Sequence, residues 1–264
     1  MYANVGAHKL YYEVHGDAGP WVVLSHSLAC DHTMWDPQIP LLAKHYRVLA
    51  YDTRGHGKSD VPPGPYTLDD LAADVIGVMD AVGVERAHLV GLSMGGMTAQ
   101  HAALMAPERF LSLVLADTSA RIPPELRPMW EQRMATAREQ GMAALEAGTL
   151  ERWFTAGYRA SNPGPVAAIG ELIRSTPVDG YVGCSHGISH LDVLDRIGSI
   201  TCPVLVIVGA EDAGTPVAWH EAIHAAIPHS KYVVLQDAAH LSNIEQAAAF
   251  DAALMPFLAA ASGA

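Results

Sequence analysis

The sequence is poor in cysteine and in positive charge, and it has no hydrophobic run long enough to cross a membrane. Its three cysteines, Cys30, Cys184 and Cys202, form no C-x-x-C pair, which indicates free thiols and not a disulfide framework. Lys and Arg number 16 against 28 Asp and Glu, and the net charge of −12 disfavours nucleic acid and anionic membranes as partners. Residues 1–4 begin no basic-then-apolar signal segment, so we expect a cytoplasmic protein.

Short apolar runs alternate with helical patterns along most of the chain. Half of the 264 residues are hydrophobic, which is ample for a core. Short continuous apolar runs are typical of buried strands, whereas apolar residues three and four positions apart are typical of helices. The alternation predicts an α/β fold, in which a mostly parallel sheet has helices on both faces. Expected strands cover residues 8–14, 21–24, 46–51, 89–92, 111–116, 203–209 and 232–235, and expected helices cover 34–45, 66–82, 97–103 and 242–260.

The alternation of expected strands and helices is interrupted between residues 122 and 192. This stretch has helical segments punctuated by glycine and proline, and no convincing buried strand. We therefore predict a core domain formed by residues 1–121 and 193–264, with residues 122–192 inserted as a helical cap. A cap inserted at the carboxyl end of a parallel sheet would cover a ligand site at that edge.

Residues 89–103 combine an apolar run, a serine between glycines and a helical pattern. The sequence Gly91-x-Ser93-x-Gly95, set between a strand and a helix, matches the nucleophile elbow of serine hydrolases. The serine of such a turn stands on a strained backbone that exposes its hydroxyl, and the glycines avoid collisions on either side. The N-terminus of the next helix favours an oxyanion nearby. We predict Ser93 as a catalytic nucleophile; the alternative is a glycine-rich turn with an incidental serine.

A serine nucleophile needs a base, and the base needs an acid that orients it. In hydrolases with this elbow, the chain order is Ser, then Asp or Glu, then His. Asp212 and His240 each follow an expected buried strand, which places them at the same edge of the sheet as Ser93. We predict Asp212 as the acid and His240 as the base. Asp117, which also follows a strand, and Glu211 are alternatives for the acid.

An oxyanion hole requires two backbone N–H groups. Met94, the residue after the nucleophile, is expected to supply one of them. Leu28, in the loop after the strand at residues 21–24, is expected to supply the other. His26 is expected to line this loop without taking part in proton transfer.

A second motif competes with the serine site. The run His220-Glu221-Ala222-Ile223-His224 matches H-E-x-x-H, a zinc-binding pattern of peptidase helices. Ile227 and Ser230 stand where the extended pattern has Gly and His, which leaves Glu245 as a distant third ligand. The helix connects two strands and so covers a face of the sheet away from its carboxyl edge. We therefore expect no metal and no cofactor, and a zinc peptidase is the alternative.

Several stretches carry a resemblance to a known family. They are His26-Ser27-Leu28, Tyr51-Asp52-Thr53-Arg54-Gly55-His56-Gly57, Gly91-Leu92-Ser93-Met94-Gly95-Gly96-Met97, Leu150-Glu151-Arg152-Trp153-Phe154-Thr155 and Ala239-His240-Leu241-Ser242-Asn243-Ile244-Glu245-Gln246. In them the chain resembles the 3-oxoadipate enol-lactonases, over nearly its whole length. The resemblance implies an α/β-hydrolase fold and cofactor-free hydrolysis of 3-oxoadipate enol-lactone to 3-oxoadipate in aromatic catabolism. It also implies that Ser93 forms an acyl-enzyme with the help of His240 and Asp212.

The implied substrate carries a carboxylate, so a cationic contact in the cap is expected. Ser189 stands where the family has an arginine, and this departure bears on the identity of the substrate. His190, Arg133 or Arg152 could compensate for it. The two tryptophans of the cap could wall the pocket or pack in the core of the cap. The predicted pocket residues are His26, Trp130, Arg133, Trp153 and His190.

Three other functions stay open beside the enol-lactonase. The first is hydrolysis of a different small ester or lactone, which substrate profiling would distinguish. The second is a ligand receptor with this fold, which would keep the three predicted residues but turn over very slowly. The third is the zinc peptidase, whose activity would be lost with a chelator and retained in Ser93→Ala. Because the serine, acid and base are all present, the sequence favours an enzyme with a small-molecule ester or lactone substrate.

Overall fold

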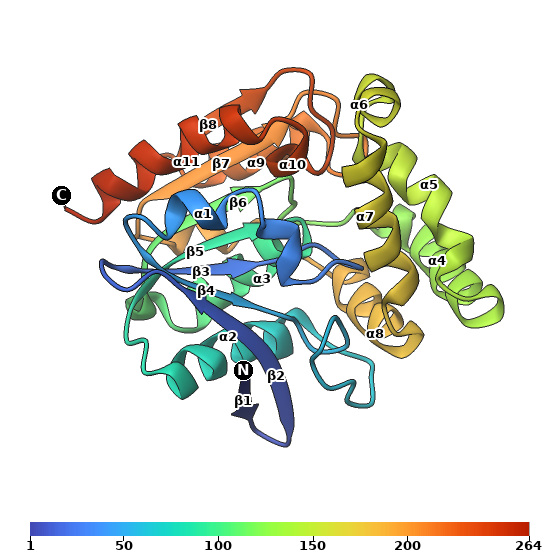
Figure 1. Ribbon diagram of the computed structural model, residues 1–264, viewed down its shortest axis with the longest axis horizontal. Helices are drawn as coiled ribbons and strands as arrows, with labels where there is room; N and C mark the ends of the chain where they lie inside the picture. The colour runs from blue at the N-terminus through green and yellow to red at the C-terminus, as the bar shows by residue number, and fades with distance from the viewer. Residues whose placement is uncertain (264) are drawn as a thin grey trace.

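An eight-stranded sheet forms the centre of the structure, a computed structural model that describes residues 1–263 (Figure 1). The strands lie in the order β1-β2-β4-β3-β5-β6-β7-β8. β1 and β2 are antiparallel, as are β2 and β4, and all other neighbours are parallel. The strands are β1 (Tyr2–Val5), β2 (His8–His15), β3 (Trp21–Ser25), β4 (Arg47–Tyr51), β5 (Ala87–Leu92), β6 (Phe110–Ala116), β7 (Val204–Gly209) and β8 (Lys231–Leu235).

The inner parallel strands are continuously apolar because helices cover both of their faces. Every residue of β5 and β7 is buried. The seven expected strands are confirmed, within two residues at their ends. β1 is not predicted from the sequence, because it is a four-residue edge strand in which only Ala3 is buried. The order places β6 between β5 and β7, the strands that precede Ser93 and Asp212, so the carboxyl ends of these three parallel strands follow one another along one edge of the sheet.

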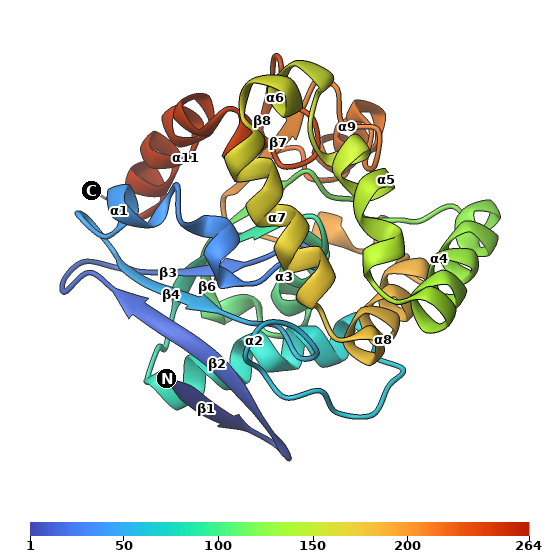
Figure 2. The ribbon, with the colours of Figure 1, turned by 45° about the vertical axis from the view of Figure 1, so that its right-hand side comes forward.

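Helices cover the two faces of the sheet (Figure 2). α1 and α11 lie on one face, and α2, α3 and α9 lie on the other, which confirms the predicted architecture. α2 begins with a capping box, in which Thr67 and Asp70 each accept a hydrogen bond from the other's backbone N–H. The helices of the core are α1 (Ile39–Leu42), α2 (Leu68–Val82), α3 (Met94–Met105), α9 (Val217–Ala226), α10 (Ser242–Glu245) and α11 (Ala247–Ala261).

The expected helix over residues 34–45 is wrong. A short 3₁₀ helix at His32–Trp35 and the single turn α1 take its place. Pro37 and Pro40 have no N–H and clash with the preceding turn, so a helix that starts at residue 34 cannot continue through them. Pro40 instead occupies the first turn of α1, where a missing N–H costs nothing.

Five helices lie between β6 and β7, on the side where the parallel strands end (Figures 1 and 2). The chain leaves the core and returns to it at neighbouring points, since Arg121 and Asp192 pair as an isolated antiparallel bridge. We call the segment between them the cap. Its helices are α4 (Arg127–Gln140), α5 (Ala143–Trp153), α6 (Ala156–Ser161), α7 (Pro163–Ser175) and α8 (Val178–Ser189).

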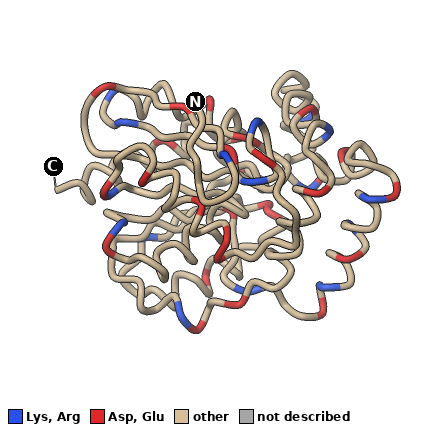
Figure 3. Tube along the Cα trace, turned by 90° about the horizontal axis from the view of Figure 1, so that it is seen from below, with Lys and Arg blue, Asp and Glu red and all other residues tan. Residues whose placement is uncertain are grey.

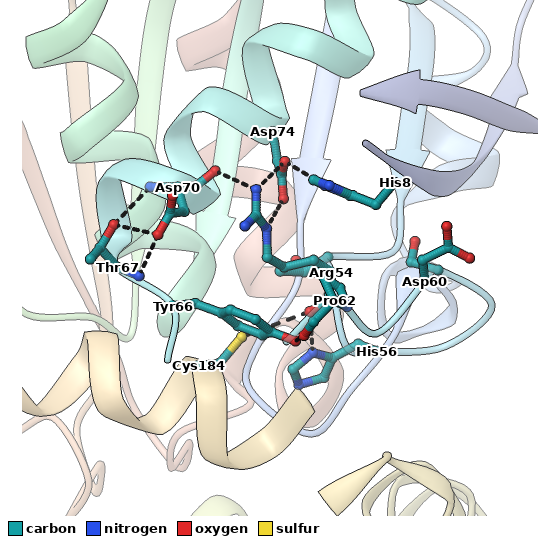
Figure 4. A network of polar contacts seen from close by, with 12 residues as sticks. His8, Arg54, His56, Asp60, Pro62, Tyr66, Thr67, Asp70, Asp74 and Cys184 are labelled. Carbon is teal, nitrogen blue, oxygen red and sulfur yellow. Dashed lines mark hydrogen bonds and ion pairs between the residues drawn. The ribbon is translucent and has the colours of Figure 1, made fainter. Parts of the chain in front are cut away.

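Arg54 and Tyr66 link the core to α8 of the cap (Figure 4). Arg54 donates to both carboxylate oxygens of the buried Asp74 in α2, at 2.5 and 2.7 Å, and its guanidinium lies 5.5 Å from the centre of the Tyr66 ring. The N–H of Tyr66 donates to the carbonyl of Gly183 in α8 at 3.2 Å. The thiol of Cys184 contacts the Arg54 carbonyl at 3.8 Å. These contacts fix α8 on the core and so hold the cap at the carboxyl edge of the sheet.

Charged residues of both signs are scattered along the trace (Figure 3). The acidic excess of the composition is therefore not confined to one segment in this view. Among residues 1–263, no helix combines the length and the apolar character that a membrane span needs.

Candidate active site

Ser93 lies in a sharp turn between β5 and α3. Its backbone has φ 56° and ψ −116°, a left-handed conformation that costs energy for a residue with a side chain. A Cβ at Gly91 would lie 2.2 Å from the carbonyl oxygen of Gly95, and a Cβ at Gly95 would lie 2.0 Å from the carbonyl oxygen of Ser25. Only glycine fits at these two positions. The sequence pattern thus has a direct steric cause.

Ser93, His240 and Asp212 form a hydrogen-bonded series. The Oγ of Ser93 lies 2.9 Å from Nε2 of His240, and Nδ1 of His240 lies 2.8 Å from Oδ2 of Asp212. The other oxygen of Asp212 accepts the N–H groups of Gly214 at 2.8 Å and Thr215 at 2.9 Å. The Thr215 hydroxyl donates to Oδ2 at 2.6 Å. The acid is thereby held in one orientation toward the imidazole.

At His240 and Asp212, charge and hydrogen bonds together outweigh the effect of burial on the pKa values. Burial alone would lower the pKa of His240, but the negative charge of Asp212 and its hydrogen bond raise it. Burial alone would raise the pKa of Asp212, but the charge of His240 and the hydrogen bonds from His240 and Thr215 lower it. An imidazole with an ionised carboxylate at Nδ1 and a hydroxyl at Nε2 can remove the hydroxyl proton, so the arrangement can activate a serine for acyl transfer.

Neither of the two alternative acids forms a hydrogen bond with His240 among residues 1–263. Asp117 is completely buried and binds the N–H of Gly209 and the hydroxyl of Ser242. The side chain of Glu211 is exposed. Thr215 was not among the residues that sequence reasoning selected, although Asp212 with glycine two residues later is a turn signal in which a carboxylate accepts backbone N–H groups.

Two backbone N–H groups are available beside Ser93. The N–H groups of Leu28 and Met94 donate no hydrogen bond to any residue from 1 to 263. The N–H of the neighbouring Ala29 is taken up, because it donates to Nε2 of His56 at 3.0 Å. Burial lowers the pKa of His56 to about 3, so its ring is neutral and can accept this bond. Leu28 also borders the same cavity as Ser93.

A cavity of about 320 Å³ lies over Ser93 and His240, between the core and the cap. Its wall is mostly apolar. The predicted residues Trp130, Arg133 and Trp153 border it, and the ring of Trp153 lies 5.9 Å from that of His240. Further lining residues that sequence reasoning did not select include Met97, Ile122, Met142, Tyr181 and Trp219. Apart from Met97, which ends the stretch around the nucleophile, these apolar and aromatic positions belong to none of the motifs above, so only the folded chain brings them together.

Two arginines face this cavity without an acidic partner. Arg54, Arg109, Arg121 and Arg174 form ion pairs with carboxylates. Of the arginines that form no ion pair within residues 1–263, Arg133 and Arg152 border the cavity, and both are half-buried. Burial lowers the pKa of both guanidinium groups, and the charge of Arg133 lowers that of Arg152 further. The guanidinium of Arg133 lies 5.1 Å from the centre of the Trp130 ring. The cavity therefore combines apolar walls with uncompensated positive charge.

His26 and His190 are corrections to the predicted pocket, since neither borders the cavity. His26 is completely buried, and its Nε2 accepts the N–H of Thr53 at 2.9 Å. Its ring therefore links the loop after β3 to the loop after β4. The side chain of His190 is exposed beyond the end of α8, where Nδ1 lies 2.9 Å from the carbonyl oxygen of His186. Ser189 is buried and its hydroxyl also donates to that carbonyl, at 2.8 Å.

The histidines of the H-E-x-x-H run are engaged in the packing of α9. His220 is buried, and its Nε2 accepts the N–H of Thr118 at 2.7 Å. Nδ1 of His224 lies 2.7 Å from the hydroxyl of Ser230. Glu245 binds Thr155 of the cap and the N–H of Ala239. The three residues of the alternative zinc site, His220, His224 and Glu245, thus have separate protein partners.

The sequence matches the family described as "alpha/beta hydrolase fold" over residues 20–247. The chain belongs to the α/β-hydrolase family. The expected fold is confirmed by this match and by the parallel sheet with its two helical layers.

Similar proteins narrow the kind of hydrolase. This α/β-hydrolase is 38% identical to "3-oxoadipate enol-lactonase 2" of Acinetobacter baylyi, over 93% of this chain and 91% of the relative. It superimposes on the crystal structure of the enol-lactonase from Burkholderia xenovorans with a TM-score of 0.94 and 41% identity, over 98% of this chain and 100% of that one. A "putative carbamate hydrolase RutD" of a Caulobacter species is 30% identical over 94% of this chain and 95% of the relative. The resemblance to enol-lactonases is confirmed, and the chain is an ester-hydrolysing enzyme.

Proposed function

We propose that this α/β-hydrolase opens a small lactone that carries a carboxylate, and that its substrate is 3-oxoadipate enol-lactone. The observation that carries the proposal is that two half-buried guanidinium groups, Arg133 and Arg152, border the cavity of Ser93 and His240 without a carboxylate partner among residues 1–263. The only hydrogen bond of the Arg152 guanidinium within these residues is to the Thr149 hydroxyl, at 3.2 Å. A buried charge without a partner is costly, and an anionic substrate would offset that cost through charge-assisted hydrogen bonds. The similarity to enol-lactonases supports the same substrate class.

Acylation follows from the hydrogen-bonded series. Ser93 attacks the lactone carbonyl while His240 takes its proton at Nε2, and Asp212 stabilises the imidazolium at Nδ1. The N–H groups of Leu28 and Met94 donate to the oxyanion. The ring C–O bond then breaks, and the leaving oxygen departs as an enolate that His240 protonates. The resulting enol converts to the ketone.

Deacylation uses the same base. His240 removes a proton from water, and the hydroxide attacks the acyl carbonyl of the Ser93 ester. Collapse of the second oxyanion returns the proton from His240 to the Ser93 oxygen and releases 3-oxoadipate. Every step moves only protons and electron pairs between substrate, water and these side chains, so the proposal includes no cofactor.

The proposed recognition of a carboxylate is tested by removing the arginines. In Arg133→Met and Arg152→Met, kcat/KM for 3-oxoadipate enol-lactone should fall by about 10–100-fold, because each change removes a hydrogen bond to a charged group. For a five-membered enol-lactone without the carboxymethyl group, kcat/KM of both variants should stay within about 3-fold of the wild-type value. Arg127→Met, an exposed arginine of α4 outside the cavity, is the control. Equal losses on both lactones would contradict a role in binding the carboxylate.

Hydrolysis of a carbamate is the second candidate, because relatives named as putative carbamate hydrolases are about 30% identical over nearly the whole chain. The serine machinery proposed above would serve an ester or a carbamate carbonyl equally. Turnover of a carboxylated carbamate at a higher kcat/KM than the enol-lactone would replace the proposed substrate and leave the proposed roles of Ser93 and His240 unchanged.

A further inference from the structure

The turn formed by Ala116, Asp117 and Thr118 lies at the centre of the active-site edge. It begins at the last residue of β6, the strand between those that lead to Ser93 and to Asp212. All three of its residues are buried, and Asp117 has a φ of 44°. A left-handed conformation at a residue other than glycine is strained, and it persists only where surrounding contacts hold it.

The residues on either side of Asp117 hold the backbone of the nucleophile. The N–H of Ser93 donates to the carbonyl of Ala116 at 2.9 Å, and the hydroxyl of Thr118 donates to the carbonyl of Ser93 at 2.7 Å. Both polar backbone groups of Ser93 are therefore bound by this one turn. Since Ser93 is itself strained, these bonds help to keep its hydroxyl in place.

The side chain of Asp117 holds the other two catalytic loops. Its Oδ1 accepts the N–H of Gly209 at 2.8 Å, where β7 ends three residues before Asp212. Its Oδ2 lies 2.5 Å from the hydroxyl of Ser242, two residues after His240. One carboxyl group thus bridges the loop of the acid and the loop of the base, without contacting either Asp212 or His240.

We infer that Asp117 is a positioning residue for the proposed hydrolysis, whose carboxyl group fixes the distance between the acid and base loops while its turn fixes Ser93. This inference rests on the proposed roles of Ser93, His240 and Asp212. No cation pairs with Asp117 among residues 1–263, and burial together with the nearby charge of Asp212 raises its pKa well above the usual range. Its Oδ1 accepts the N–H of Gly209, and its Oδ2 accepts the hydroxyl of Ser242. The amide of an asparagine can keep both bonds, with its oxygen accepting from Gly209 and its N–H donating to the Ser242 oxygen.

The test compares Asp117→Ala with Asp117→Asn. In Asp117→Ala, kcat should fall by roughly 10–100-fold while KM changes by less than about 3-fold, because small displacements of reacting groups cost rate more than binding. In Asp117→Asn, kcat should stay within about 3-fold of the wild type, since the amide can make both bonds. Rescue by asparagine separates positioning of the loops from a need for negative charge.

Controls make the result specific. Ser112→Ala removes an equally buried polar side chain near the start of the same strand, where its hydroxyl pairs with His88, and should lower the thermal midpoint while leaving kcat unchanged. If Asp117→Ala does not fold, Ser242→Ala removes one of the two bridges, and its kcat should fall by about 3–10-fold. Wild-type kcat in folded Asp117→Ala, or in Ser242→Ala, overturns the inference, as does an equal loss in Asp117→Ala and Asp117→Asn. Activity that survives in Ser93→Ala instead overturns the proposed function.

Discussion

Burial and charge act in opposite directions on the residues that the proposal places at the centre of the reaction. His240 and Asp212 are both almost completely buried, so water cannot stabilise the charge of either side chain. Each supplies the countercharge of the other, at 2.8 Å. The pair therefore favours an ionised acid beside an imidazole that binds a proton more tightly than free histidine does.

Asp212→Asn tests this electrostatic account. The proposed base must be neutral to act, so kcat/KM should fall as the pH is lowered through the pKa of His240. Without the negative charge, the imidazolium loses its stabilisation, and this acidic limb should move to lower pH. At the plateau, kcat should be lower by roughly 10³–10⁴-fold, because an amide also favours the wrong tautomer. A pH profile of kcat/KM measures both effects; an unchanged limb would contradict the account.

Single residues differ in how far sequence predicts them. Ser93 stands in a short motif whose glycines have a steric cause, and Asp212 and His240 follow strands that are recognisable by their apolar runs. The pocket has no such signal. His26 and His190 were expected to border it and do not, because the directions of their side chains depend on packing that no local pattern encodes.

At the scale of elements, Glu245 of α10 joins the cap to the loop of His240. Its carboxylate accepts the N–H of Thr155 at 3.1 Å and the N–H of Ala239 at 2.9 Å, and the Thr155 hydroxyl also contacts it. On the other side of His240, the N–H of Leu241 donates to the carbonyl of Trp153 at 3.1 Å. The loop of the proposed base is therefore held by the cap on both sides.

Glu245→Ala should loosen this junction. We expect kcat/KM for the lactone to fall by about 10-fold, because the loop loses bonds to a charged group, and Glu245→Gln should retain part of the activity. Hydrogen exchange should become faster at residues 153–158. Glu151→Ala, at an exposed glutamate of α5, serves as the control. Unchanged exchange in this segment, with wild-type kinetics, would show that the carboxylate does not couple the cap to the loop.

Elements were predictable where one pattern dominates. The long apolar face of residues 66–82 marks α2, and the structure confirms this helix, which begins at Leu68 after the capping residue Thr67. The prediction of one helix over residues 34–45 was wrong, because the apolar spacing there is helical while Pro37 and Pro40 interrupt the backbone hydrogen bonds. Backbone chemistry therefore overrides periodicity over short segments.

At the scale of the whole molecule, several histidines are buried as neutral groups. Burial lowers the pKa of His56 to about 3, and that of His88 and His220 to about 4. In the unfolded chain each should titrate near 6.5. Between this value and the folded pKa, only the unfolded chain binds the proton, so stability falls as the pH falls.

The thermal midpoint should therefore decrease from pH 7 to pH 4, by roughly 5–10 °C. His32 and His240 oppose the trend, since the carboxylates of Asp52 and Asp212 raise their pKa values. Burial lowers the pKa of His26 as well, so two histidines oppose four. His88→Gln, far from the proposed site, should make the decrease smaller; His229→Gln, at an exposed histidine, should not. Calorimetry over this range gives the midpoints, and an identical slope in wild type and His88→Gln would be the contrary result.

The overall architecture was predictable because buried parallel strands are continuous apolar runs and alternate with helices. The arrangement of the cap helices around the cavity was not, since it depends on tertiary contacts such as that between Tyr66 and Gly183. Arg133 and Arg152 become informative only in this arrangement, where they face the cavity without acidic partners.

The most direct test of the central claim is turnover of 3-oxoadipate enol-lactone by the wild type and by Ser93→Ala. Loss of the ultraviolet absorbance of the lactone follows the reaction, and a p-nitrophenyl ester is assayed alongside. We predict fast lactone turnover by the wild type and a loss of roughly 10⁴-fold or more in Ser93→Ala. Turnover that survives in Ser93→Ala would contradict the serine mechanism. Fast ester turnover with little lactone turnover by the wild type would contradict the proposed substrate.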